Sequence, residues 1–306
     1  MSPAMRLLAA GVLFSLGGAL IKASAFPALQ SAGLRSLVAG VTLFALLPEA
    51  RRWPRGRMLW LLLPYFGATC LFVVANTLTT AANAIFLQST APFWVTVLAP
   101  LLLKETTRRR DLLVLLCIAA GMTMFFVAPQ AASSTARDPR LGDWIALASG
   151  LSYALLLLGF RALGRSGGDS GGAATVVAWG NVLTVPITWA IAPAFGQDWI
   201  AGDAQSWLVM AVLGTLQVGL AYALVVRAMP HVPALQASLI LMIEPALNPV
   251  LAFLAHGERP HALALGGGAL IVGAVVLGSL RRRARAAPPA AAAPPFPRAA
   301  GSGTEE

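Results

Sequence analysis

Residues 91–105 read APFWVTVLAPLLLKE, and residues 244–258 read EPALNPVLAFLAHGE. In both stretches a proline stands second and a glutamate follows it by 13 residues. An earlier spacing agrees, because Gly11 to Lys22 and Gly150 to Arg161 are each 11 residues. Self-similarity at a fixed offset is the signature of an internal repeat. The sequence therefore predicts two related halves within one chain.

The composition places these halves in a membrane. Of 306 residues, 58% are hydrophobic and 11% are charged, whereas a soluble domain carries about 25% charged residues. A helix needs about 20 mostly apolar residues to cross a bilayer. The apolar runs predict an all-α membrane protein with ten transmembrane helices, at residues 7–24, 32–48, 58–76, 81–102, 111–128, 144–163, 174–195, 206–227, 233–254 and 264–280.

Ten spans divide into two units of five. Because five is odd, the second unit must enter the membrane upside down, which predicts two inverted five-helix repeats. We expect the first repeat at 1–128, an external linker at 129–143 and the second repeat at 144–280. Residues 281–306 are rich in proline and alanine, a composition that cannot bury enough apolar surface to fold, and they predict a disordered cytoplasmic tail.

The loop charges set the orientation. With both termini cytoplasmic, 17 of the 22 basic residues fall on the inner side and 5 on the outer side, as the positive-inside rule requires. The net charge of +10 then reflects topology in the cell inner membrane, and nucleic-acid binding is not expected. The first apolar run followed by Ala23-Ser24-Ala25 imitates a cleavable signal peptide, but Lys22 beside that site favours retention.

Two long stretches resemble a known family. Residues 77–122, which begin TLTTAANAIFLQSTAPFW, and residues 221–273, which contain MIEPALNPVLAFLAHGERPH, resemble the repeats of the EamA family in the drug/metabolite transporter superfamily. The resemblance implies ten helices in two inverted repeats, cytoplasmic termini, and a central cavity that passes small polar metabolites, often amino acids and commonly outward. One departure is Lys104, where the family more often has glycine before the glutamate.

Glu244 is the leading candidate for substrate binding or coupling. A charged residue midway along a span is costly in lipid and usually faces a cavity or a partner. Asn248 lies one turn later on the same face, and Pro245 removes a backbone donor beside it. Removal from water favours the neutral carboxyl, so Glu244 can take up and release a proton. A purely structural carboxylate that fixes helix packing is the alternative.

The remaining candidates have weaker signals. Lys22 ends the first helix, where it either reaches the headgroups or pairs with a substrate carboxylate, and Arg35 is expected to be an interfacial anchor. Polar and aromatic side chains inside spans suggest a polar interior. Those expected to contact substrate are Asn83, Trp94, Tyr153, Tyr222 and Gln236, with Asn83 and Gln236 at equivalent repeat positions.

The absence of two motifs reduces the range of functions that the sequence allows. The two lysines follow Ile21 and Leu103, outside any Walker A loop, and HExxH is absent. No catalytic residue, metal or cofactor is therefore expected. The sequence predicts a secondary transporter, not an enzyme, that exports a small polar solute in exchange for protons, as a monomer or homodimer in the lipid bilayer. An uptake permease or passive facilitator is the alternative, and a non-transporting membrane scaffold is a third interpretation.

Overall fold

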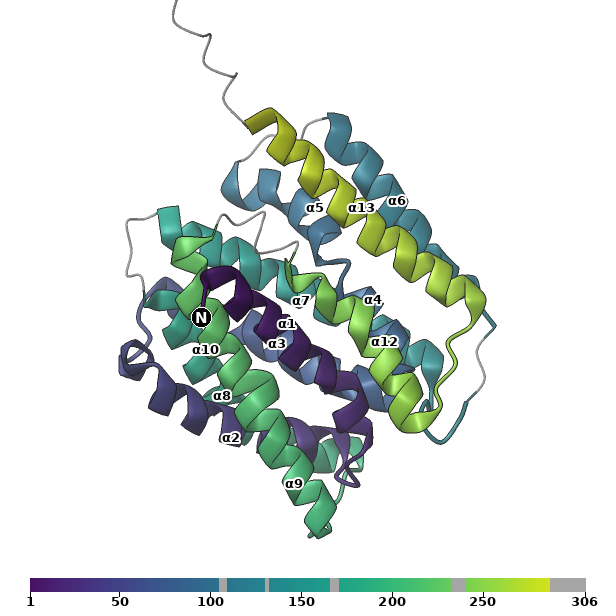
Figure 1. Ribbon diagram of the computed structural model, residues 1–306. Helices are drawn as coiled ribbons and strands as arrows, with labels where there is room; N and C mark the ends of the chain where they lie inside the picture. The colour runs from purple at the N-terminus through teal and green to yellow at the C-terminus, as the bar shows by residue number, and fades with distance from the viewer. Residues whose placement is uncertain (105–108, 130–131, 166–170, 233–239, 287–306) are drawn as a thin grey trace, which may run out of the picture.

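The computed structural model describes residues 1–104, 109–129, 132–165, 171–232 and 240–286 of the 306-residue chain. The described residues fold into a bundle of helices (Figure 1). The helices are α1 (Pro3–Lys22), α2 (Ala28–Leu46), η1 (Pro48–Arg51), α3 (Arg57–Leu78), α4 (Ala81–Gln88), α5 (Ala91–Leu103), α6 (Arg109–Val127), α7 (Pro139–Arg165), α8 (Gly172–Ile191), η2 (Ala192–Phe195), α9 (Ala204–Val212), η3 (Leu213–Leu220), α10 (Ala221–Ala228), η4 (Met229–His231), α12 (Ile243–His256) and α13 (Ala262–Ala286).

Seven helical segments of the described residues are long and apolar enough to cross a membrane, at residues 3–22, 28–46, 57–78, 81–103, 139–163, 172–195 and 204–228. Two shorter apolar helices cover 112–127 and 262–277. The ninth predicted span begins in residues 233–239, which lie outside the described part of the chain. The count of ten therefore stays a prediction, while a multi-pass helical membrane protein agrees with the exposed apolar side chains of Trp60, Leu63 and Leu101.

Two helices extend across limits that were expected for the linker and the tail. Helix α7 begins at Pro139, inside the expected linker 129–143, because a proline suits the first turn of a helix, where its missing donor is not needed. Helix α13 continues to Ala286, past the boundary set at 280. The run of arginine and alanine there consists of strong helix formers. The rest of the predicted tail, 287–306, lies outside the described residues.

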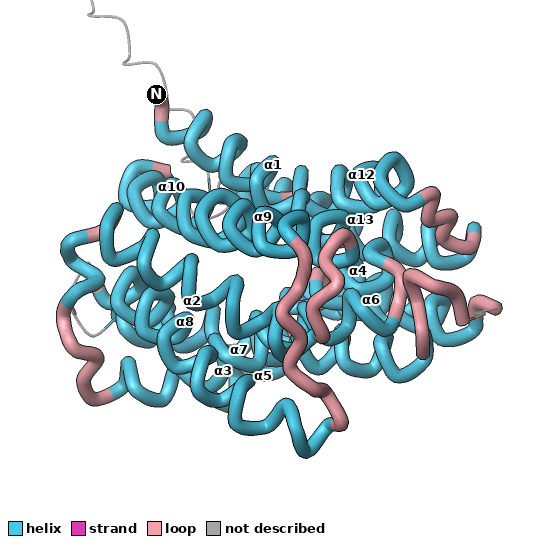
Figure 2. Tube along the Cα trace, turned by 90° about the horizontal axis from the view of Figure 1, so that it is seen from below, coloured by secondary structure: helices cyan, strands magenta, loops and turns pink. Residues whose placement is uncertain are grey.

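The helices pack in a pattern that repeats when the two halves are exchanged. Helix α1 packs on η3 and α10 and on α12, and its equivalent α7 packs on α3 and on α4 and α5. The equivalent helices α2 and α8 pack on each other, as do α6 and α13 (Figure 1). Figure 2 shows α1, α9, α10 and α12 on one side of the bundle and α3 and α7 on the other. The described helices thus form a two-repeat architecture.

Three of the predicted spans contain breaks in their α-helical hydrogen bonding. The span over 81–103 is divided into α4 and α5 at Ser89 and Thr90. At the equivalent place in the second half a turn at Met242 precedes α12. Between α9 and α10 the chain forms a π-helix, Leu213–Leu220. Breaks of this kind are frequent at functional sites, so the residues beside them are candidates for such a site.

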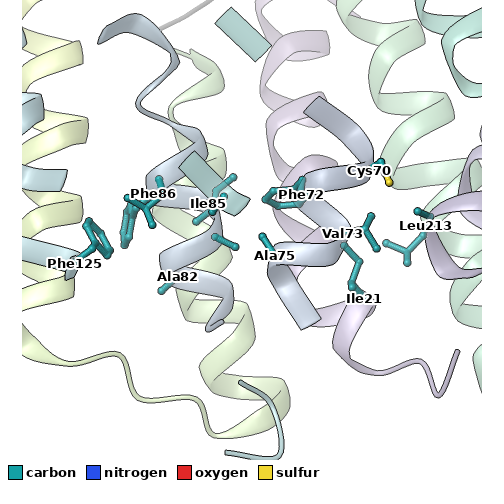
Figure 3. Packing of buried hydrophobic residues seen from close by; sticks show 14 of the residues in the cluster. Ile21, Cys70, Phe72, Val73, Ala75, Ala82, Ile85, Phe86, Phe125 and Leu213 are labelled. Carbon is teal, nitrogen blue, oxygen red and sulfur yellow. The ribbon is translucent and has the colours of Figure 1, made fainter. Parts of the chain in front are cut away.

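The largest buried cluster joins the repeats. Ile21 of α1, Phe72 and Val73 of α3, and Leu213 of η3 pack together at one end of it (Figure 3). The other end continues through Ile85 and Phe86 of α4 to Phe125 of α6. Side chains this deeply buried contribute about 1.5–3 kcal/mol each in a soluble protein. The cluster fixes α4 against its neighbours and so holds the polar residue at the end of α4, Gln88, in place.

Candidate substrate site

A small polar cavity lies beside the three breaks. Its volume is about 80 Å³, which is room for a few water molecules. The lining combines aromatic rings with amide, hydroxyl and charged groups. It consists of Phe14, Arg35, Ala68, Thr69, Phe72, Gln88, Tyr153, Gln217, Val218, Tyr222 and Glu244. Both repeats contribute, because the first six of these residues belong to helices α1 to α4 and the other five belong to α7, η3, α10 and α12.

Glu244 lies in the first turn of α12, directly after the break. A helix N-terminus favours a negative charge through its unpaired N–H groups and its dipole. The side chain is half-buried and lines the cavity. It interacts electrostatically with Tyr153 and Tyr222 and forms no ion pair with another described residue. The carboxyl is therefore placed to meet a cation or a proton that enters the cavity.

The aromatic and amide parts of the lining are held by their own contacts. Phe14 and Tyr222 meet edge to face, with ring centroids 5.1 Å apart. The Gln88 amide donates to Ser149 Oγ at 2.7 Å and to the Ala68 carbonyl oxygen at 3.1 Å. Two of the residues expected to contact substrate, Tyr153 and Tyr222, thus line the same cavity as Glu244.

Arg35 is not the interfacial anchor that its place near the start of α2 suggested. Only 3% of the residue is exposed, and it lines the cavity. Within the described part of the chain, its Nη2 donates to the Thr69 carbonyl oxygen at 3.3 Å. The prediction was wrong because α2 begins at Ala28, before the predicted span that starts at residue 32. This start places Arg35 about two turns inside the helix.

Gln217 is a second cavity residue that was not among the predicted substrate contacts. It lies on the π-helix and is 5% exposed, and its Nε2 donates to the Phe14 carbonyl oxygen at 3.5 Å. The wider turn of a π-helix changes the direction of the side chains that follow. A glutamine within a span was visible in the sequence, but its orientation depends on the π-helix, which the apolar pattern does not reveal.

Lys22 lies at one end of the bundle, outside the cavity lining. Its ammonium is 2.7 Å from Glu258 Oε1, and both side chains are 3% exposed. It also donates to the carbonyl oxygens of Thr79, at 2.7 Å, and Thr135. An ammonium has three donors, and three oxygen atoms lie within hydrogen-bonding distance of this one. Lys22 therefore neither reaches the headgroups nor keeps a donor for a substrate in this conformation.

The ion pair belongs to a larger set of buried polar contacts, which we call the end network: Lys22, Thr79, Asn83, Asp143 and Glu258. Glu258 Oε2 accepts from the Ala81 backbone N–H at 2.9 Å, at the start of α4. Asp143 accepts from Thr79 Oγ1 at 2.7 Å and from Asn83 Nδ2 at 3.1 Å. The end network ties α1, α3, α4 and α7 together at this end.

Three other residues expected to contact substrate lie away from the lining, and a fourth, Gln236, is outside the described residues. Asn83 belongs to the end network. Trp94, on α5, packs edge to face against Phe93 with centroids 5.1 Å apart. Asn248 is fully buried beside Gly18 of α1 and does not line the cavity. Proximity to Glu244 along α12 did not bring Asn248 to the same space, because α1 covers that face.

The comparisons with known proteins agree with this architecture. The family model described as the EamA-like transporter family matches residues 1–127 and again residues 140–280. The chain belongs to the EamA-like transporter family. Its members are transporters rather than enzymes, and they move small-molecule solutes across the bilayer. This EamA-family chain is accordingly a multi-pass membrane protein built from two repeats.

A solved structure titled "Crystal structure of protein" shares the fold of the EamA-family chain. It aligns with a TM-score of 0.63 and 20% sequence identity, over 91% of this chain and 98% of that chain. No curated protein sequence matches the chain. The family match thus identifies the chain as a transporter. The residues that line the cavity are the basis for inferring the transported solute.

Proposed function

We propose that this EamA-family protein is a secondary transporter of the cell inner membrane that exports a small polar organic solute by alternating access, in exchange for protons carried by Glu244. The observation that carries the proposal is the polar cavity at the helix breaks. Transporters commonly bind their substrates between two repeats, at discontinuous helices. Here α4 ends at the cavity with Gln88, and Glu244 in the first turn of α12 lines the same cavity.

The course of the chain supports inverted repeats in the membrane. The start of α2 lies near the end of η2, since the Leu29 N–H donates to Gln197 Oε1 at 2.9 Å. The end of α2 lies near the start of α8, where Thr175 Oγ1 donates to the Glu49 carbonyl oxygen at 3.4 Å. The equivalent helices α2 and α8 therefore run antiparallel. A twofold axis in the membrane plane produces this relation between two inverted units.

The charge at the cavity supports proton coupling. Glu244 is a half-buried carboxyl with no ionic partner among the described residues. A carboxyl in that position is neutral when the cavity is empty and charged when a cation is bound, because an unpaired charge is costly away from water. A solute that brings a cationic or proton-donating group to Glu244 can therefore be exchanged for the proton of this carboxyl, whatever other groups the solute carries.

The test is transport of radiolabelled amino acids and related metabolites by purified protein in vesicles with an imposed pH gradient. We expect the wild type to concentrate at least one solute against its gradient. The Glu244→Gln variant should lose this concentrative transport and retain exchange down a solute gradient.

The matched control is Asp198→Asn, which removes an exposed carboxyl in the loop between η2 and α9, outside the cavity. This variant should transport as the wild type does. Full concentrative transport by Glu244→Gln would remove the coupling role from Glu244.

A further inference from the structure

Arg35 is a buried cation with no counter-charge among the described residues. The residue is 3% exposed, and no carboxylate among the described residues forms an ion pair with it. Its Nε finds no acceptor in the described part of the chain, and Nη2 donates to a backbone carbonyl. Isolating a charge from water is costly unless an opposite charge compensates it. A group that the described residues do not supply is therefore expected to complete this site.

Glu244 does not fill that role, although it lines the same cavity. The two residues form no ion pair, and each interacts electrostatically with Tyr222, from α10. The guanidinium also interacts with Tyr65. The cavity thus has a cationic group on α2 and a carboxyl on α12, with tyrosine hydroxyls near both. A ligand group that carries hydrogen-bond acceptors could therefore bind Arg35 while Glu244 stays in its place.

We infer that the transported solute carries a carboxylate, which binds the Arg35 guanidinium inside the cavity. The inference rests on the proposed transport function and names the substrate class. A guanidinium pairs with a planar carboxylate through two parallel hydrogen bonds. Arg35 is the one cationic residue in the described lining, so a single negative charge balances it, and a dianionic phosphate does not. The rings of Phe14, Phe72 and Tyr222 suit an apolar body on the acid.

Binding is tested with matched pairs of small molecules on detergent-solubilised, full-length protein. The probes are propionate, lactate and 3-phenylpropionate, each with its neutral amide, and phenyl phosphate, at constant ionic strength set by chloride. Thermal unfolding and calorimetric titration report binding. We expect at least one carboxylate to bind the wild type at least tenfold more tightly than its amide and than phenyl phosphate. The Arg35→Gln variant loses this preference, whereas Arg35→Lys retains part of it.

Arg227→Gln is the matched control. Arg227 Nη2 also donates to a backbone carbonyl, that of Leu46 at 2.6 Å, but the residue is exposed and outside the cavity. This variant should bind the carboxylate as the wild type does.

A second measurement separates a ligand site from a packing role. Without ligand, Arg35→Gln should unfold at a higher temperature than the wild type, because it removes an uncompensated charge.

The inference is overturned if no carboxylate binds the wild type, if amides or phenyl phosphate bind as well as the acids, or if Arg35→Gln keeps the preference. Its failure is distinct from failure of the transport function. A solute without a carboxylate that is transported at equal rates in wild-type and Arg35→Gln vesicles would refute the proposed substrate class. That result would not refute the proposed transport function. Vesicles with no flux of any solute would instead refute transport.

Discussion

Lys104 shows how one residue carries strain at the end of a helix. It follows α5 with φ of 53°, in the left-handed region, while its repeat equivalent Gly257 follows α12 with φ of 65°. In both places the backbone N–H of this residue donates to a carbonyl oxygen of the helix it ends, that of Ala99 or Phe253. Glycine adopts this conformation without a Cβ clash, and lysine does not.

Replacing this lysine should therefore stabilise the protein. We expect Lys104→Gly to raise the free energy of unfolding by about 1 kcal/mol, the cost of a left-handed conformation for a residue with a Cβ. The reverse change, Gly257→Ala, should lower it by a similar amount. Thermal unfolding in detergent measures both. A Lys104→Gly protein that unfolds at or below the wild-type temperature would contradict the argument.

At the scale of helices, the end network joins α1, α3, α4 and α7 and contains a buried ion pair between Lys22 and Glu258. We expect Glu258→Gln to lower the free energy of unfolding by about 3 kcal/mol or more, because it leaves the Lys22 ammonium buried without its counter-charge. The double variant Lys22→Met with Glu258→Gln should lose less than the sum of the single variants. Thermal unfolding of all three measures the coupling, with Arg137→Gln, at an exposed arginine, as the control. Additive losses would contradict a coupled pair.

The sequence predicted helices far better than it predicted their breaks. Long apolar runs indicate helices because lipid leaves few other ways to satisfy backbone groups. The turn at Ser89 and Thr90 and the π-helix over Leu213–Leu220 interrupt runs that remain apolar. Such interruptions are stabilised by contacts from other helices, so a single run carries no sign of them. The same limit hid the burial of Arg35, whose surroundings come from α3 and α10.

At the scale of the molecule, the repeat spacing was the most informative signal in the sequence. The equal distances from proline to glutamate align Lys104 with Gly257 and Ala91 with Glu244. The structure adds that the equivalent residues have different roles. Ala91 begins α5 without a charge, while Glu244 brings a carboxyl to the cavity. A symmetric fold with unequal side chains therefore gives the described lining one carboxyl, from the second repeat.

Inversion of the repeats makes a prediction for the whole molecule. Lys104 and Arg259 are exposed residues that follow the equivalent helices α5 and α12. If the repeats are inverted, the two residues lie on opposite sides of the membrane. In a protein whose Cys70 and Cys117 are replaced by alanine, Lys104→Cys should react with a membrane-impermeant maleimide only in inside-out vesicles, and Arg259→Cys only in intact cells. Labelling of both from one side would require parallel repeats, and the alternating-access mechanism built on inversion would not apply.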